Sequence, residues 1–82
     1  MKGTIVGINS RNQLHAVRTD ATEITIFQMV GSHQAKMRDI VSGNLDTPGS
    51  ATLFNETQKA EFEANIQEVH CSALKASELL NR

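Results

Sequence analysis

The stretch from Met1 to Gln28, MKGTIVGINSRNQLHAVRTDATEITIFQ, decides the fold of this chain. Apolar and polar residues alternate in three of its segments, and these segments are rich in Val, Ile and Thr, which favour β-strands. The three predicted strands cover residues 2–9, 14–19 and 22–28. The links between them have two to four residues, too few for the crossover that parallel strands require. We therefore predict that residues 1–28 form an antiparallel meander.

The middle of the chain is predicted to add further strands. Residues 37–45 have strand character, with a bend at Gly43. The clearest turn follows at residues 46–50, where Pro48 is the only proline of the sequence. Residues 51–55, directly after this turn, are expected to form another short strand.

The stretch from Gln58 to Val69 fits two different structures. Phe62, Ala64 and Ile66 alternate with acidic and amide residues, which is typical of a strand with one solvated face. Phe62, Ile66 and Val69 also lie at helical spacing that continues towards the C-terminus, so one long helix is the alternative. We favour the strand.

A C-terminal helix is predicted for residues 72–81. Ser72 can cap its first turn, and Ala73, Ala76 and Leu80 form one apolar stripe. Several short strands followed by a helix are typical of a small closed barrel, because closure leaves no strand edge exposed.

The predicted fold is therefore mainly β, a five- or six-stranded OB-like barrel with a C-terminal α-helix. An SH3-like barrel is the alternative. A length of 82 residues supports one hydrophobic core, so we expect a single domain over residues 1–82. In this domain residues 1–28 supply the meander and residues 37–69 the remaining strands.

The composition excludes several classes of protein. Hydrophobic residues are 39% of the chain and charged residues 21%, so the chain can form a core but is too polar for a membrane span. The net charge of −1 gives no overall field that attracts nucleic acid or an anionic membrane. The single cysteine excludes an internal disulfide, and the first residues lack the apolar core of a signal peptide. We therefore expect a cytoplasmic protein without a membrane partner.

No pattern predicts catalysis, a cofactor or a metal site. His70 and Cys71 are neighbours, so their side chains would point to opposite faces of a strand. His15 and His33 have no second ligand at zinc-binding spacing. A nucleophilic Cys71 would need a suitably placed base. We expect that the protein is not an enzyme and has no catalytic residues, cofactor or metal, and that Cys71 is a buried thiol in front of the helix.

The charged residues are unevenly distributed along the chain. Residues 1–40 carry five basic and three acidic side chains, whereas residues 41–82 carry three basic and six acidic ones. If the basic residues of the first half gather on one side of the barrel, they can contact the phosphates of a nucleic acid. The alternative is an ordinary solvated surface. These basic residues are Lys2, Arg11, Arg18, Lys36 and Arg38.

The residues Met1 to Ile5 (MKGTI), followed by Ile8 and Asn9, resemble the first strand of cold-shock domains. These domains are a branch of the OB fold and bind single-stranded RNA and DNA. The resemblance covers roughly the first 28 residues by motif and the rest of the chain by arrangement only. It implies that the nucleic-acid face includes Gly7, Leu14, Ala16, Thr25, Phe27 and Gln28. Phe27 is the only aromatic residue among them.

The first functional hypothesis is weak, non-catalytic binding of single-stranded RNA or DNA. Basic side chains of the first three strands would contact phosphates, and Phe27 would stack on a base, an interaction of about 1–3 kcal/mol per base. Leu14 and Ala16 would offer apolar contact without a planar ring. The predicted nucleic-acid site consists of Lys2, Arg11, Leu14, Arg18 and Phe27.

The second hypothesis is a protein-interaction or homo-oligomerising barrel with no nucleic-acid role. Its aliphatic face or its C-terminal helix would contact a protein partner or a second copy of the chain. The helix must bury its apolar stripe, and the surface around Leu14 and Ala16 is one place where it can do so. Leu14, Ala16 and Phe27 form a platform for a ligand if they are exposed, and belong to a core if the helix covers them.

Overall fold

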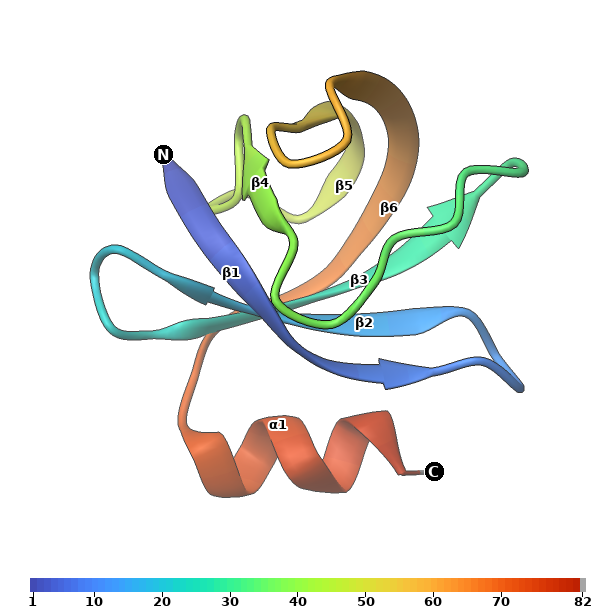
Figure 1. Cartoon of the computed structure of the whole chain (residues 1–82). Coiled ribbons are helices and arrows are strands. Elements are labelled where there is room, and N and C mark those ends of the chain that lie inside the picture. The colour runs from blue at the N-terminus through green and yellow to red at the C-terminus, as the bar shows by residue number, and fades with distance from the viewer. Residues whose placement is uncertain (82) are drawn as a thin grey trace.

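The computed structural model describes residues 1–81 and contains, in this range, six β-strands followed by one α-helix (Figure 1). The strands are antiparallel and close into a barrel in the order β1, β2, β3, β6, β5, β4. The predicted mainly β barrel with a C-terminal helix is confirmed. The elements are β1 (Lys2–Asn9), β2 (Leu14–Thr19), β3 (Ile24–Val30), β4 (Ile40–Ser42), β5 (Gly49–Asn55), β6 (Ala60–Cys71) and α1 (Ala73–Leu80).

The barrel is built from a Greek key. β1, β2 and β3 form the predicted meander, and the chain then returns through residues 31–39 so that β4 pairs with β1. The neighbouring strands therefore follow the order β4, β1, β2, β3, which defines a Greek key. The long strand β6 curves around the barrel and pairs with both β3 and β5, which closes it (Figure 1).

Residues 60–71 form a strand, so the preferred structure for residues 58–69 is confirmed and the single long helix is wrong. Phe62, Ala64 and Ile66 are buried in the barrel, whereas the residues that alternate with them are exposed. The strand expected over residues 37–45 is shorter than predicted. It is confined to β4. On one side the carboxylate of Asp39 accepts a hydrogen bond from the backbone N–H of Lys36 in the preceding loop, and on the other side Gly43 leaves the strand conformation with a φ of 139°.

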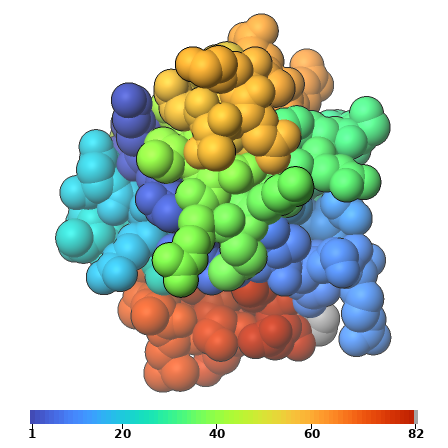
Figure 2. Space-filling view, in the orientation of Figure 1, coloured from blue at the N-terminus to red at the C-terminus, as the bar shows by residue number. Residues whose placement is uncertain are grey.

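The core has two parts, one inside the barrel and one between the barrel and α1. The interior contains Ile5, Val17, Phe27, Met29, Val41, Leu45, Leu53, Phe62, Ala64 and Ile66. The second part joins the outer face of the sheet to the helix and contains Ala16, Ile26, Cys71, Ala76 and Leu79. The helix covers the surface around Ala16, which the sequence had left open as one possibility. The expectation that Cys71 is a buried thiol is confirmed. Figure 2 shows the helix packed directly against the barrel.

Local interactions fix α1 in this position. The hydroxyl of Ser72 accepts a hydrogen bond from the backbone N–H of Lys75 (3.2 Å) and caps the first turn, as predicted. At the other end, the amide nitrogen Nδ2 of Asn9 donates to the carbonyl oxygen of Leu80 (2.6 Å). A Cβ atom at Gly7 would lie 2.7 Å from Cδ2 of Leu80. Glycine at this position therefore lets the helix approach β1 closely.

Truncation of Ile26 tests the contact between helix and barrel. Ile26 is 1% exposed and its side chain on β3 packs in the part of the core beneath α1. We expect Ile26→Ala to lower the free energy of unfolding by roughly 2–5 kcal/mol, because the small domain cannot fill the cavity that results. Chemical denaturation followed by circular dichroism measures this loss. Val30→Ala on the same strand, at a side chain that is 50% exposed, is the control and should change stability by less than about 1 kcal/mol. Equal losses of stability in both variants would contradict the described packing of α1 on β3.

Candidate functional site

The structure places the aromatic member of the predicted nucleic-acid site inside the barrel. Phe27 is 0% exposed because it lies on the inward face of β3. Its ring stacks on His15, with ring centroids 5.0 Å apart and planes 6° apart, and contacts Phe62 at 5.7 Å. A base has no access to this ring, so the expected stacking role of Phe27 is corrected to a core role. Ala16 is buried in the part of the core beneath the helix, and Leu14 is half-buried against the same part.

The structure brings together two of the three basic residues of the predicted site. Lys2 and Arg18 line one hollow of about 370 Å³ together with Asp20. Arg11 lies in the turn after β1, at the other end of an eight-residue strand, which corresponds to roughly 25 Å. Figure 1 shows the turn between β1 and β2 and the turn between β2 and β3 on opposite sides of the barrel. Arg11 therefore cannot act at the same site as Lys2 and Arg18.

The hollow at Lys2 and Arg18 continues towards α1. A second hollow of about 290 Å³ shares Arg18 and is lined by Val6, Ile24 and Ala73. We call the two hollows together the trough. The trough crosses four strands. Thr4 on β1 pairs with Ile40 on β4 and with Arg18 on β2, and Arg18 pairs with Ile24 on β3. These four residues form one outward-facing row. The lining residues used below are Lys2, Val6, Arg18, Ile24, Ile40 and Ala73.

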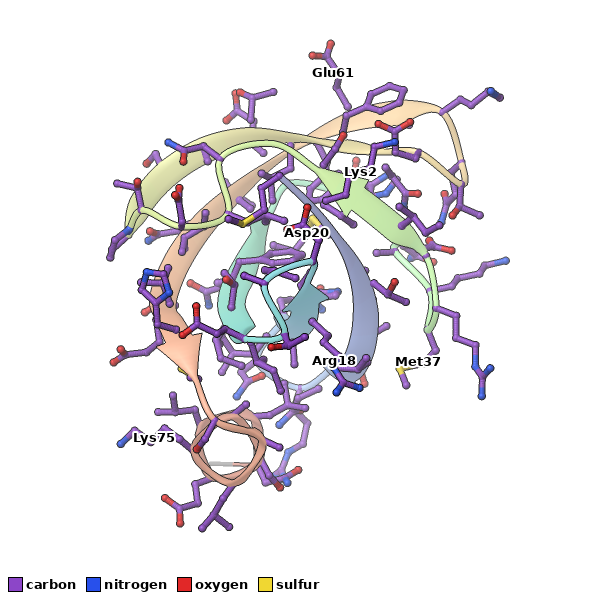
Figure 3. The ribbon with its side chains drawn as sticks, turned by 90° about the vertical axis from the view of Figure 1, so that its left-hand side faces the viewer. Lys2, Arg18, Asp20, Met37, Glu61 and Lys75 are labelled. Carbon is purple, nitrogen blue, oxygen red and sulfur yellow. The ribbon has the colours of Figure 1, made fainter. Side chains whose placement is uncertain are left out.

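The trough combines exposed aliphatic side chains with cations that have no carboxylate partner. Val6 and Ile40 are each 42% exposed. Within residues 1–81 the single ion pair joins Nδ1 of His70 to Oε1 of Glu23 at 2.8 Å, so neither Lys2 nor Arg18 is paired. Figure 3 shows Lys2, Asp20 and Arg18 on the side of the barrel viewed there, with α1 seen end-on below them. A ligand with apolar side chains and a carboxylate fits such a surface.

A polar cluster around the buried side chains of Asp39 and Asn55 lies next in sequence to Ile40 of the trough, and no sequence pattern predicted it. Oδ2 of Asp39 accepts hydrogen bonds from Nδ2 of Asn55 (2.9 Å), Nε2 of Gln58 (2.7 Å) and the backbone N–H of Lys36 (2.9 Å). Burial alone would raise the pKa of Asp39, but these hydrogen bonds outweigh it and lower the pKa. The cluster ties the segment before β4 to the turn after β5. It thereby fixes Ile40 beside β1.

Other kinds of site and comparisons with known proteins add no assignment. Within residues 1–81, no group of three or more His, Cys, Asp or Glu side chains is arranged to hold a metal ion. In the same range, no helix is both long enough and apolar enough to cross a membrane. Comparisons with protein-family models, curated proteins and solved structures find no match to this chain. The trough is therefore the candidate site on the strength of its geometry.

Burial lowers the pKa of His15, which forms one end of the ring stack inside the barrel. Burial is the main cause, and the neighbouring His33 adds to it, while the hydrogen bond to the carbonyl oxygen of Gln13 works in the opposite direction. That bond joins Nδ1 of His15 to the oxygen at 2.9 Å, so Nδ1 carries the hydrogen and donates it. The folded protein therefore protonates His15 less readily than the unfolded chain does.

The lowered pKa of His15 predicts that the protein loses stability in mild acid. Below about pH 6.5, the ordinary pKa of histidine, the unfolded chain takes up a proton that the folded protein does not, so the free energy of unfolding falls as the pH falls. The lowered pKa of Asp39 also makes the free energy of unfolding fall as the pH falls, but only below about pH 4, where unfolded carboxylates become protonated. Chemical denaturation at pH 7.5, 6.5 and 5.5 measures the slope.

Two variants identify the group responsible for that slope. His15→Phe keeps a ring to stack on Phe27, and His15→Gln keeps a polar side chain, but neither titrates in this range. We expect both to show a flatter dependence of stability on pH between 5.5 and 7.5 than the unmodified protein. If both variants keep the original slope, His15 is not its source.

Proposed function

We propose that this protein is a non-catalytic interaction module that binds a protein segment in the trough. The observation that carries the proposal is the placement of the unpaired Arg18 among Val6, Ile24 and Ile40 on the outer wall of the barrel. Aliphatic side chains of a partner can fill the hollows on either side of Arg18. A carboxylate of the same partner can then accept two parallel hydrogen bonds from the guanidinium group.

A protein partner is favoured over a nucleic acid because the outer wall offers little that recognises bases. Phe27 and Phe62 are both buried in the barrel. The third phenylalanine, Phe54, is half-buried on β5 and does not line the trough, so the proposed surface lacks the stacking that contributes about 1–3 kcal/mol per base. Arg11 is remote from the trough, which leaves Lys2 and Arg18 as cations for phosphates. Two such contacts give only a weak affinity.

As part of the same proposal, we assign the barrel to an OB-like type. The Greek-key order of its strands supports this, because OB folds are five-stranded Greek-key barrels. The barrel has one strand more than that pattern. OB folds bind oligonucleotides on the face of their second and third strands, and α1 covers this face here through Ala16 and Ile26. The proposed binding surface is the neighbouring one, which also includes β1 and β4.

Peptide selection tests the proposed function without a known partner. Random peptides displayed on phage are selected against the protein, and the enriched peptides are synthesised for titration. We expect them to combine Leu, Ile or Val with Asp or Glu. Ile40→Asp and Arg18→Glu should each weaken binding about tenfold or more, a loss of roughly 1.4 kcal/mol. Both side chains are exposed, so the fold should tolerate the substitutions, and circular dichroism checks this.

Thr52→Asp serves as the matched control, because Thr52 is exposed on β5 and does not line the trough. It should bind the selected peptides as the unmodified protein does. Selected peptides that bind equally well to all three variants would show that the trough is not the binding surface. Titration with mixed single-stranded oligonucleotides adds a second test. Binding that falls steeply with salt and with Lys2→Glu would favour the nucleic-acid function instead.

A further inference from the structure

We propose that the segment bound in the trough is α1 of a second copy of this chain, so that the protein forms a symmetric dimer. This inference rests on the proposed function of the trough and names its partner. Three features carry it: an exposed leucine and a carboxylate on the outer side of α1, a hollow of suitable size beside Arg18, and the position of the helix at the border of the trough.

The outer side of α1 presents an apolar side chain and a carboxylate one turn apart. Leu74 is 73% exposed, more than any other large hydrophobic side chain of residues 1–81. Ala76 and Leu79 face the barrel, and Leu74 lies on the opposite side of the helix. Glu78 is also exposed and follows Leu74 by four residues, a spacing that places side chains about 5–6 Å apart on one face. The helix therefore carries the ligand chemistry that the trough requires.

The trough can accept these two side chains. Its hollow beside α1 has a volume of about 290 Å³ and is lined by Val6, Ile24 and Arg18. An apolar cavity of about 150 Å³ accommodates benzene, so a leucine side chain fits. With Leu74 of the second copy in this hollow, Glu78 of that copy lies about one helical turn away, within reach of the long Arg18 side chain.

The position of the helix makes the contact self-complementary. Ala73, in the first turn of α1, lines the same hollow as Val6 and Arg18. A two-fold axis beside Ala73 places each helix over the trough of the other copy, so that Leu74 and Glu78 of each chain meet the partner's trough. Such an isologous arrangement is the commonest in soluble oligomers and closes without forming a filament. It requires both charges on one face, and Arg18 and Glu78 supply them.

The domain has enough surface for this dimer. The smallest specific interfaces bury about 600 Å² on each partner, which is about an eighth of the accessible surface of 4885 Å². The longest and shortest dimensions of the domain are 30 and 23 Å, so one side of it can supply that area. We therefore expect a dimer of modest affinity.

Analytical ultracentrifugation with charge reversal tests the dimer. We expect the unmodified protein to pass from monomer to dimer between about 1 and 500 μM, the range of small interfaces. Arg18→Glu and Glu78→Arg should each weaken dimerisation about tenfold or more, and the double variant should restore it, because the pair is re-formed with opposite signs. Leu74→Ser should abolish the dimer in this range. A peptide selected on the trough should compete with dimerisation.

Two control variants accompany these measurements. Lys75→Glu changes a charge on the side of α1 that points away from Arg18 in Figure 3, and Val30→Ser removes an exposed apolar side chain outside the trough. Both should dimerise like the unmodified protein. Monomers at every concentration, or a double variant that is not restored, would overturn the dimer. If peptides still bind the trough of such a monomer, the proposed function stands and the second copy is not its partner.

Discussion

The packing of α1 on the outer face of β1, β2 and β3 is the contact on which the rest of the molecule depends. It buries Ala16 and Ile26 under Ala76 and Leu79, and Gly7 makes the close approach feasible. The helix has only eight residues and spans about 12 Å, so it covers part of this outer wall and leaves the row beside it open. The same contact therefore covers part of the outer face of β2 and β3 and forms the border of the trough.

The small number of aromatic residues determines which side chains remain on the surface of the barrel. The chain has three Phe and no Trp or Tyr, and Phe27 and Phe62 form the middle of a stack that His15 and His33 complete. Such stacks stabilise a core beyond the burial of apolar area, which matters in a domain with little interior. The third phenylalanine, Phe54, is half-buried on β5 outside this stack. It does not line the trough, which presents aliphatic side chains and charges. These recognise the side chains of a protein better than the flat faces of bases.

Local patterns were sufficient to predict most of the strands, but not the candidate site. The alternation of β-branched residues in residues 2–9 and 14–19 predicted β1 and β2 to the residue, and the alternation around Phe62 correctly outweighed the helical spacing. Asp39 and Asn55 lie 16 residues apart, and their hydrogen bond leaves no periodic signal. The row of the trough arises from the register of four strands, so the sequence indicated Lys2 and Arg18 but not the aliphatic residues between which Arg18 lies.

The outward side of α1 carries side chains that complement the trough, which the barrel alone does not provide. A surface helix of a monomer turns its apolar residues to the core and its polar residues to water. One exposed leucine on such a helix is ordinary, but Leu74 is accompanied by the exposed Glu78, and the neighbouring Ala73 lines the hollow that contains Arg18. Under two-fold symmetry each copy supplies both halves of the contact, so two equal contacts form in one encounter. In the proposed dimer the second contact forms without further loss of translational and rotational freedom, so two individually weak contacts would suffice to hold the copies together.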